Sequence, residues 1–159
     1  MRLPILHHPD PRLRRVAPPV AVFDEGLRQL VQDMAETMYD ARGIGLAAPQ
    51  VGVDAQIVVI DLTGPDRREG LQVFINPRLH KGKGRTRMAE GCLSLPGQQV
   101  QPWRFARIEV SAQDAQGRSF RMKSTGLLAI CLQHECDHLR GVLMVDASQT
   151  QGPDLPGPD

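Results

Sequence analysis

The segment QHECDH, residues 133–138, contains two histidines four positions apart, with a glutamate directly after the first. On a helix, residues four positions apart lie on the same face, so His134 and His138 can reach one metal ion. Glu135 would lie about 100° further round the helix, where its carboxylate can take a proton from a metal-bound water. The pattern therefore predicts the metal-binding helix of a hydrolase. The alternative is a chance pair of histidines on an ordinary core helix.

A catalytic metal ion typically has three protein ligands, so the pattern needs one more donor. Two protease patterns fail here, because a third histidine six residues on would fall at Met144 and no glutamate follows Glu135. Cys131 would lie about 10 Å along the helix from His138, which is too far for a shared ion, and Cys136 would point away. The donors that remain open are Cys92, His7, His8 and His80.

The hydrophobic pattern predicts the elements that would position these residues. Apolar residues at helical spacing follow Asp24, a favourable N-cap, and Gly43 would end this first helix. A second helix over residues 126–140, capped by Thr125 and ended by Gly141, would carry the histidines. Between the helices, apolar runs and alternation predict strands at 56–62 and 71–76 and an antiparallel hairpin formed by 105–113 and 120–123.

Length and composition point to one domain with its own core. The 159 residues carry 19 basic and 18 acidic side chains, so the overall charge gives no argument for nucleic acid or a membrane surface as a partner. No segment has the apolar run of a signal peptide or a membrane span, and three cysteines do not make a disulfide framework. We expect a cytoplasmic protein with a domain over 1–146 and a disordered Pro/Gly-rich tail over 147–159.

Three separated segments together resemble one known family. GIGLAAPQ (43–50), EGCLS (90–94) and QHECDHLRG (133–141) are similar to the three motifs of peptide deformylases, in the same order and at similar separations. Each motif alone is weak to moderate evidence, whereas three in order are very specific. The resemblance extends over about residues 1–146. It implies an α+β fold in which antiparallel β-sheets pack around the C-terminal metal-binding helix, with the N-terminal helix on the outside.

The resemblance also implies a reaction and a role for each motif residue. Deformylases hydrolyse the formyl group from the N-terminal formyl-methionine of new polypeptides and release formate. Cys92, His134 and His138 would bind one divalent metal ion, Fe(II) in the family, with zinc, nickel or cobalt as possible substitutes. Two imidazoles and a thiolate alone would suggest zinc. Glu135 would be the general acid and base, and the Gln50 side-chain amide and the Leu93 backbone N–H would form the oxyanion hole.

The substrate would lie along the first motif. Because bulky side chains are absent there, a peptide could approach the backbone closely and pair with it as an added strand. The residues expected to bind the substrate are Gly43, Ile44, Gly45, Leu128 and Cys131, with Leu93 as a further candidate. GIGLAA also fits a relaxed dinucleotide-binding fingerprint, but that fingerprint must follow a strand and open a helix. Here it follows a helix and runs into Pro49, which argues against a nucleotide.

Several alternatives concern partners and the use of the metal. Many bacterial deformylases continue into a basic C-terminal helix associated with ribosome docking, which this chain lacks, so docking through that element is not expected. The basic cluster at 81–87 is interpreted as a solvated turn in preference to an RNA contact. We expect a monomer without a membrane or sequence-specific nucleic-acid partner. A metal site that only stabilises the fold, and a peptidase that uses the same water, are the competing hypotheses.

Overall fold

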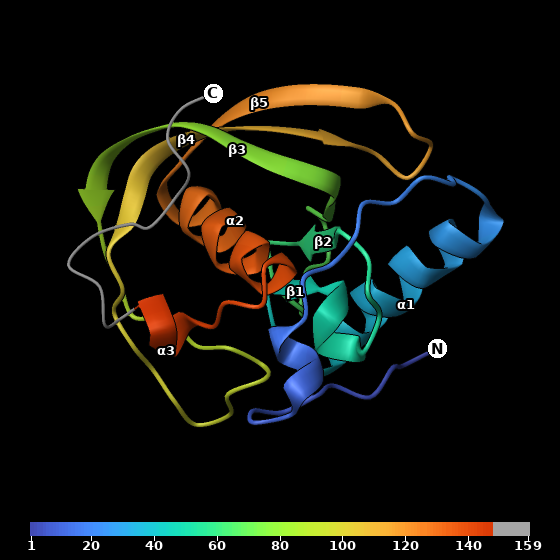
Figure 1. The fold of residues 1–159 in the computed structure, drawn as a ribbon, viewed down its shortest axis with the longest axis horizontal. Coiled ribbons are helices and arrows are strands. Elements are labelled where there is room, and N and C mark those ends of the chain that lie inside the picture. The colour runs from blue at the N-terminus through green and yellow to red at the C-terminus, as the bar shows by residue number, and fades with distance from the viewer. Residues whose placement is uncertain (148–159) are drawn as a thin grey trace.

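The computed structural model describes residues 1–147 (Figure 1). Five strands form one antiparallel sheet in the order in which they occur along the chain. The strands are β1 (Gly45–Ala47), β2 (Ile57–Ile60), β3 (Gln72–Thr86), β4 (Arg104–Gln113) and β5 (Ser119–Thr125). The helices are α1 (Glu25–Asp40), α2 (Gly126–Leu139) and the short α3 (Met144–Ala147), with 3-10 turns at Pro11–Arg14 and Ala48–Val51.

The sheet follows the hydrophobic pattern in β2, β4 and β5. All four residues of β2 are buried, and in β4 the buried Ile108 and Val110 alternate with the more exposed Arg107 and Glu109. β4 pairs with β5 in continuous antiparallel register, which confirms the predicted hairpin. The mixed α/β class with an antiparallel sheet and a helix near the C-terminus is also as predicted.

Strand β3 is much longer than the apolar run that predicted it. It continues to Thr86, with breaks in register to β4 between Ile75 and Arg78 and between His80 and Lys83. Lys81 lies in the second break with a φ of 52°, as is typical of a β-bulge. Residues 81–86 belong to β3, which pairs with β4. The interpretation of this part of the basic cluster as a turn is therefore wrong.

Helix α2 lies beneath the arch that β3, β4 and β5 form, as Figure 1 shows, and it also contacts β1 and β2. Gln133 holds it to β4, since its Oε1 accepts from the Phe105 N–H at 2.8 Å and its Nε2 donates to the Phe105 carbonyl at 2.9 Å. Thr125 precedes the helix but makes no capping side-chain hydrogen bond. Gly141 follows the helix with a φ of 75°, and a Cβ there would lie 2.4 Å from the Arg14 carbonyl oxygen. Only glycine fits that position.

Helix α1 packs its apolar face against β1 and β2. The Asp24 side chain accepts from the Leu27 N–H at 2.9 Å, so the predicted N-cap is confirmed. At the other end the left-handed residue is Arg42, with a φ of 60°, and the Gly43 N–H donates back to the Met38 carbonyl at 2.9 Å. The helix thus ends in a Schellman-type turn one residue before the glycine expected to end it.

The N-terminal segment fastens two loops that belong to different parts of the sequence. The Leu6 N–H donates to the Gln50 carbonyl at 2.7 Å, and the His8 N–H donates to the Ser94 carbonyl at 2.8 Å. Leu13, Leu95, Leu143 and Met144 form a small core, and Cys92 packs against it, so the 92–95 loop is anchored at both of its ends. Within residues 1–147, no helix has the length and apolar character that a membrane crossing requires.

Candidate metal centre and active site

Three donor side chains from two segments converge beside α2. The ligand atoms of Cys92, His134 and His138 all lie within 4.8 Å of one another, and Cys92 Sγ is 3.4 Å from His138 Nε2. Burial holds the pKa of His138 well below its usual value, so its imidazole is neutral, the form that binds a metal. A thiolate and two imidazoles suit a divalent transition metal. The donor set therefore fits one such ion.

The structure also separates the donors that the sequence left open. Among residues 1–147, Cys92, His134 and His138 are the only such group found. His7, His8 and His80 are not part of it. Cys131 and Cys136 are free thiols outside the group, as the helical geometry predicted.

A buried carboxylate orients the first histidine. His134 Nδ1 lies 3.0 Å from Glu90 Oε1, which leaves Nε2 for the metal side of the ring. Glu90 in turn accepts two hydrogen bonds from Arg104, at 2.7 and 2.9 Å. Burial alone would raise the pKa of Glu90, but Arg104 and His134 hold it below its usual value. Glu90 is therefore an anion that supports the histidine.

Arg104 extends this arrangement to the helix itself. Its Nη1 donates to Asp137 Oδ2 at 2.8 Å, and Asp137 also accepts from Arg140. Asp137, for which the sequence suggested no role, thus joins α2 to the arginine that holds Glu90. Neither Glu90 nor Arg104 was predicted from the sequence as a site residue. Alternation in β4 offered a signal, because Arg104 shares the inward face with Ile108 and an inward-facing arginine requires a buried partner.

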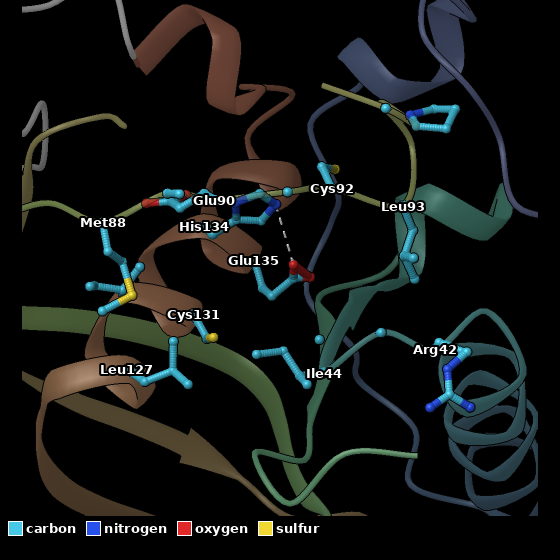
Figure 2. A pocket seen from close by; sticks show the side chains of 17 residues that line it. Arg42, Ile44, Met88, Glu90, Cys92, Leu93, Leu127, Cys131, His134 and Glu135 are labelled. Atoms are coloured by element: carbon cyan, nitrogen blue, oxygen red, sulfur yellow. Dashed lines mark hydrogen bonds and ion pairs between the residues drawn. The ribbon is translucent and has the colours of Figure 1, made fainter. Parts of the chain in front are cut away.

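Glu135 points into the cavity beside His134 (Figure 2). Its Oε1 is 3.6 Å from His134 Nε2, while its Oε2 is buried with no hydrogen-bond partner. Burial raises the pKa of Glu135 to about 7. A Cβ at Gly45 would lie 3.3 Å from the Glu135 side chain, so glycine lets β1 approach it. A carboxyl group with a pKa near 7 can both accept and donate a proton.

Gln50 is buried with its amide held in one orientation. The Ala47 N–H donates to Gln50 Oε1 at 2.9 Å, so Nε2 is the end that faces the site. Nε2 donates to Ser94 Oγ at 3.1 Å and lies 3.6 Å from Cys92 Sγ. The side-chain amide therefore presents N–H groups next to the metal ligands.

A cavity of about 450 Å³ opens beside Glu135. Gly43, Ile44, Gly45 and Cys131, which were predicted to bind the substrate, are among the residues that line it. Its further walls include Met88, Leu93, Leu127, Ile130 and His134 (Figure 2). Burial raises the pKa of Cys131 to about 12, so this thiol is a neutral part of the wall.

Leu128 is not among the residues that line the cavity and packs against the main core instead. Leu127 lines the cavity in place of Leu128. It lies three, four and seven residues before Ile130, Cys131 and His134, on one stripe of α2, whereas Leu128 is rotated by about 100°.

Comparison with known proteins identifies the family. Residues 2–153 match the sequence profile of the polypeptide deformylases. A peptide deformylase from Hahella chejuensis is 53% identical over 146 residues, which cover 91% of this chain and 86% of that protein. The chain belongs to the polypeptide deformylase family. A second relative, the peptide deformylase of Chromobacterium violaceum, is 51% identical over 144 residues, covering 91% of this chain and 85% of the relative.

Solved deformylase structures have the same fold. A crystal structure of a peptide deformylase from Legionella pneumophila superposes with a TM-score of 0.88 at 47% identity, covering 92% of this chain and 86% of that one. The enzyme from Synechococcus elongatus in complex with actinonin gives a TM-score of 0.89 at 44% identity, covering 94% and 82%. This chain is accordingly a deformylase, an enzyme that removes the formyl group from nascent peptides. The family implies a divalent metal, and the Cys92, His134 and His138 group is a possible site for it.

Proposed function

We propose that Cys92, His134 and His138 hold one divalent metal ion and that the enzyme acts on the formyl-methionine at the start of new polypeptides. The observation that carries this proposal is the convergence of these donors on the open cavity beside Glu135. Fe(II) is the ion that family resemblance favours, while the donor chemistry also suits zinc. A bound ion would polarise the formyl oxygen and lower the pKa of a water molecule toward 7.

Glu135 would move the proton in both halves of the reaction. It would accept a proton from the attacking water and return it to the amine nitrogen as the bond to the formyl carbon breaks. Its position beside His134, with one buried oxygen unpartnered, leaves an acceptor free for this task. Such a general acid and base contributes roughly 10²- to 10⁴-fold to the rate.

Gln50 and Leu93 would stabilise the charge that develops on the formyl oxygen. The Gln50 amide has its oxygen occupied by the Ala47 N–H, so Nε2 is the end directed at the site. One of its N–H groups donates to Ser94 Oγ, and the one near Cys92 Sγ, at 3.6 Å, would donate to the anion. The Leu93 backbone N–H is the second donor, adjacent to Cys92. A single donor of this kind is worth on the order of 3 kcal/mol in other hydrolases.

The cavity and β1 would hold the rest of the substrate. The methionine side chain would enter the mainly apolar part of the cavity that is lined by Ile44, Leu127 and Cys131. β1 is the first strand in the order of the sheet, so one of its edges has no neighbouring strand within residues 1–147. An extended peptide could pair with that edge and with residues 43 and 44, which lead into it.

The two competing hypotheses make different demands on this site. A metal that only stabilises the fold has no need of a buried carboxyl group that lacks a partner beside the cavity, yet Glu135 is such a group. A peptidase would accept an unformylated peptide. The two reactions therefore differ in whether the unformylated peptide is cleaved.

The test is a comparison of formyl-Met-Ala-Ser with Met-Ala-Ser, using protein purified without oxygen and analysed for metal. We expect formate and the free tripeptide from the first peptide, in amounts that follow the metal content, and no cleavage of the second. Cleavage of internal amide bonds without formate release would overturn the proposal in favour of a peptidase.

A further inference from the structure

The outer face of β3, β4 and β5 collects basic side chains that the proposed reaction does not use. We call Lys81, Lys83, Arg107, Arg121 and Lys123 the outer basic face. The chain has three lysines, and all of them are here. The register places Lys83 opposite Arg107 and Lys123 opposite Glu109. By strand alternation these side chains lie on the face opposite the buried Ile108 and Val110.

Charge on this face is less compensated than elsewhere on the surface. Several exposed arginines in other regions have acidic partners, as in the pairs Arg2–Asp40, Arg15–Asp54 and Arg67–Glu69, although Arg68 and Arg118 have no such ion pair within residues 1–147. On the outer basic face a single carboxylate, Glu109, bridges Arg121 at 2.9 Å and Lys81 at 3.7 Å. Within residues 1–147, no ion pair joins Lys83 or Arg107 to an acid. A chain with a formal net charge of only +1 therefore concentrates positive charge on one side.

The face is shaped to receive a ligand larger than a single ion. A depression of about 300 Å³ is lined by Lys81, Lys83, Arg107 and Lys123, together with the bridging Glu109 and the neutral residues Ile108, Ser124 and Thr125. Further along the same segment, the guanidinium carbons of Arg85 and Arg87 lie 4.5 and 4.7 Å from the centre of the Trp103 ring. At about 3.3 Å per residue, the cations from Lys81 to Arg87 span roughly 20 Å.

We propose that the outer basic face binds the sugar–phosphate backbone of RNA without sequence specificity. A row of cations over this length matches a chain of phosphates, and guanidinium planes stacked on an aromatic ring offer flat surfaces to unpaired bases. A lipid surface is a poorer fit, because the large exposed apolar side chains lie outside β3, β4 and β5. An acidic peptide would use the charges but not the Arg–Trp stack.

The choice of RNA over DNA rests on the proposed function. A substrate that is a newly made polypeptide meets the enzyme where RNA, not DNA, is concentrated. Figure 1 shows α2 beneath the arch of β3, β4 and β5, and strand alternation places the outer basic face on the opposite side of the sheet. None of its residues lines the catalytic cavity. Bound RNA would therefore leave the cavity open to the peptide.

The experiment measures fluorescence anisotropy of a labelled single-stranded RNA 20-mer with the metal-loaded enzyme. The test variant is Lys83→Gln/Arg107→Gln/Lys123→Gln. The matched control is Arg2→Gln/Arg15→Gln/Arg67→Gln, which removes the same charge from other surfaces. Lys83→Arg/Lys123→Arg keeps the charge. Formate release from formyl-Met-Ala-Ser is recorded on every sample, so a failure of the proposed activity is seen separately from a failure of RNA binding.

We expect the test variant to bind RNA at least tenfold more weakly than the wild type, while the control and the Lys→Arg variant stay within about twofold. If four phosphates are contacted, raising salt from 50 to 200 mM should weaken wild-type binding by about 50-fold. Formate release should be the same in all four proteins. Equal weakening in the two triple variants would overturn the proposal. So would tenfold tighter binding of DNA of the same sequence, or equal binding of polyglutamate or anionic vesicles.

Discussion

The catalytic site and the outer basic face are two charged regions on opposite sides of the same strands. The charged side chains are buried and paired in the first region, and exposed and less fully paired in the second. Around α2, Glu90, Arg104 and Asp137 are buried, and each contacts a named partner at hydrogen-bond distance. On the outer face, Lys83 and Arg107 are exposed and have no acidic partner within residues 1–147. Burial is what separates the two regions.

That difference explains what each region can do. A buried charge is costly unless its partners are fixed, so the network around α2 can hold His134 in one orientation for chemistry. An exposed cation is solvated in many orientations and interacts with any nearby anion, which suits binding that depends on salt and ignores sequence. Changes in the first region should therefore have large and specific effects, and changes in the second should have small effects on the folded enzyme.

The largest expected effect is on folding, from Arg104→Met. This change leaves the Glu90 and Asp137 carboxylates buried without the cation between them, and removing one partner of a buried pair typically costs about 3–5 kcal/mol. Urea unfolding of the metal-loaded protein should show a loss of this size. A loss below about 1 kcal/mol would mean that the Glu90 and Asp137 carboxylates do not depend on Arg104 for their stability in the folded protein.

A smaller effect is expected on the metal from Glu90→Gln. The amide retains the shape of the side chain but not the negative charge that supports His134, and such changes behind a ligand typically weaken metal affinity 10- to 100-fold. Competition with a chelator measures this directly. Glu109→Gln, the same substitution on the outer face, should leave the affinity unchanged, and equal weakening by both would contradict the role assigned to Glu90.

The smallest effect is expected from Arg121→Met, which repeats the arginine substitution on the outer face. The Arg121–Glu109 pair is largely exposed on the arginine side, and such pairs contribute little to stability. The urea midpoint should move by less than about a quarter of the shift that Arg104→Met causes. Similar midpoint shifts in the two variants would contradict the claim that the buried ion pairs contribute more to stability than the exposed one.

The spacing of apolar residues within single segments was enough to predict several helices and strands. The two long helices and the β4–β5 hairpin follow from spacing within single segments. β3 was predicted too short because its apolar run ends at Asn76 and Pro77, whereas the pairing with β4 continues beyond two breaks in register. Leu128 was assigned to the cavity only because it lies close to the motif in sequence, whereas the helical spacing that Leu127 shares with Ile130 and Cys131 places Leu127 there.

The arrangement of the site depends on contacts between distant segments, which spacing cannot supply. Helical geometry excluded Cys131 as a ligand, but Cys92 was selected only through the resemblance to deformylases. The link from His134 through Glu90 to Arg104 joins three segments and was not foreseen. The expected disorder of the tail falls, apart from residue 147, outside the residues that the structure describes. The monomeric state and cytoplasmic location stay predictions.

The central claim is that Cys92, His134 and His138 hold the metal while Glu135 moves the proton. The most direct test is Glu135→Gln, with metal content and formate release from formyl-Met-Ala-Ser measured on the same sample. We predict the same metal content as the wild type, near one ion per chain, with formate release reduced about 10²- to 10⁴-fold. Wild-type formate release by this variant with its metal in place would contradict the account.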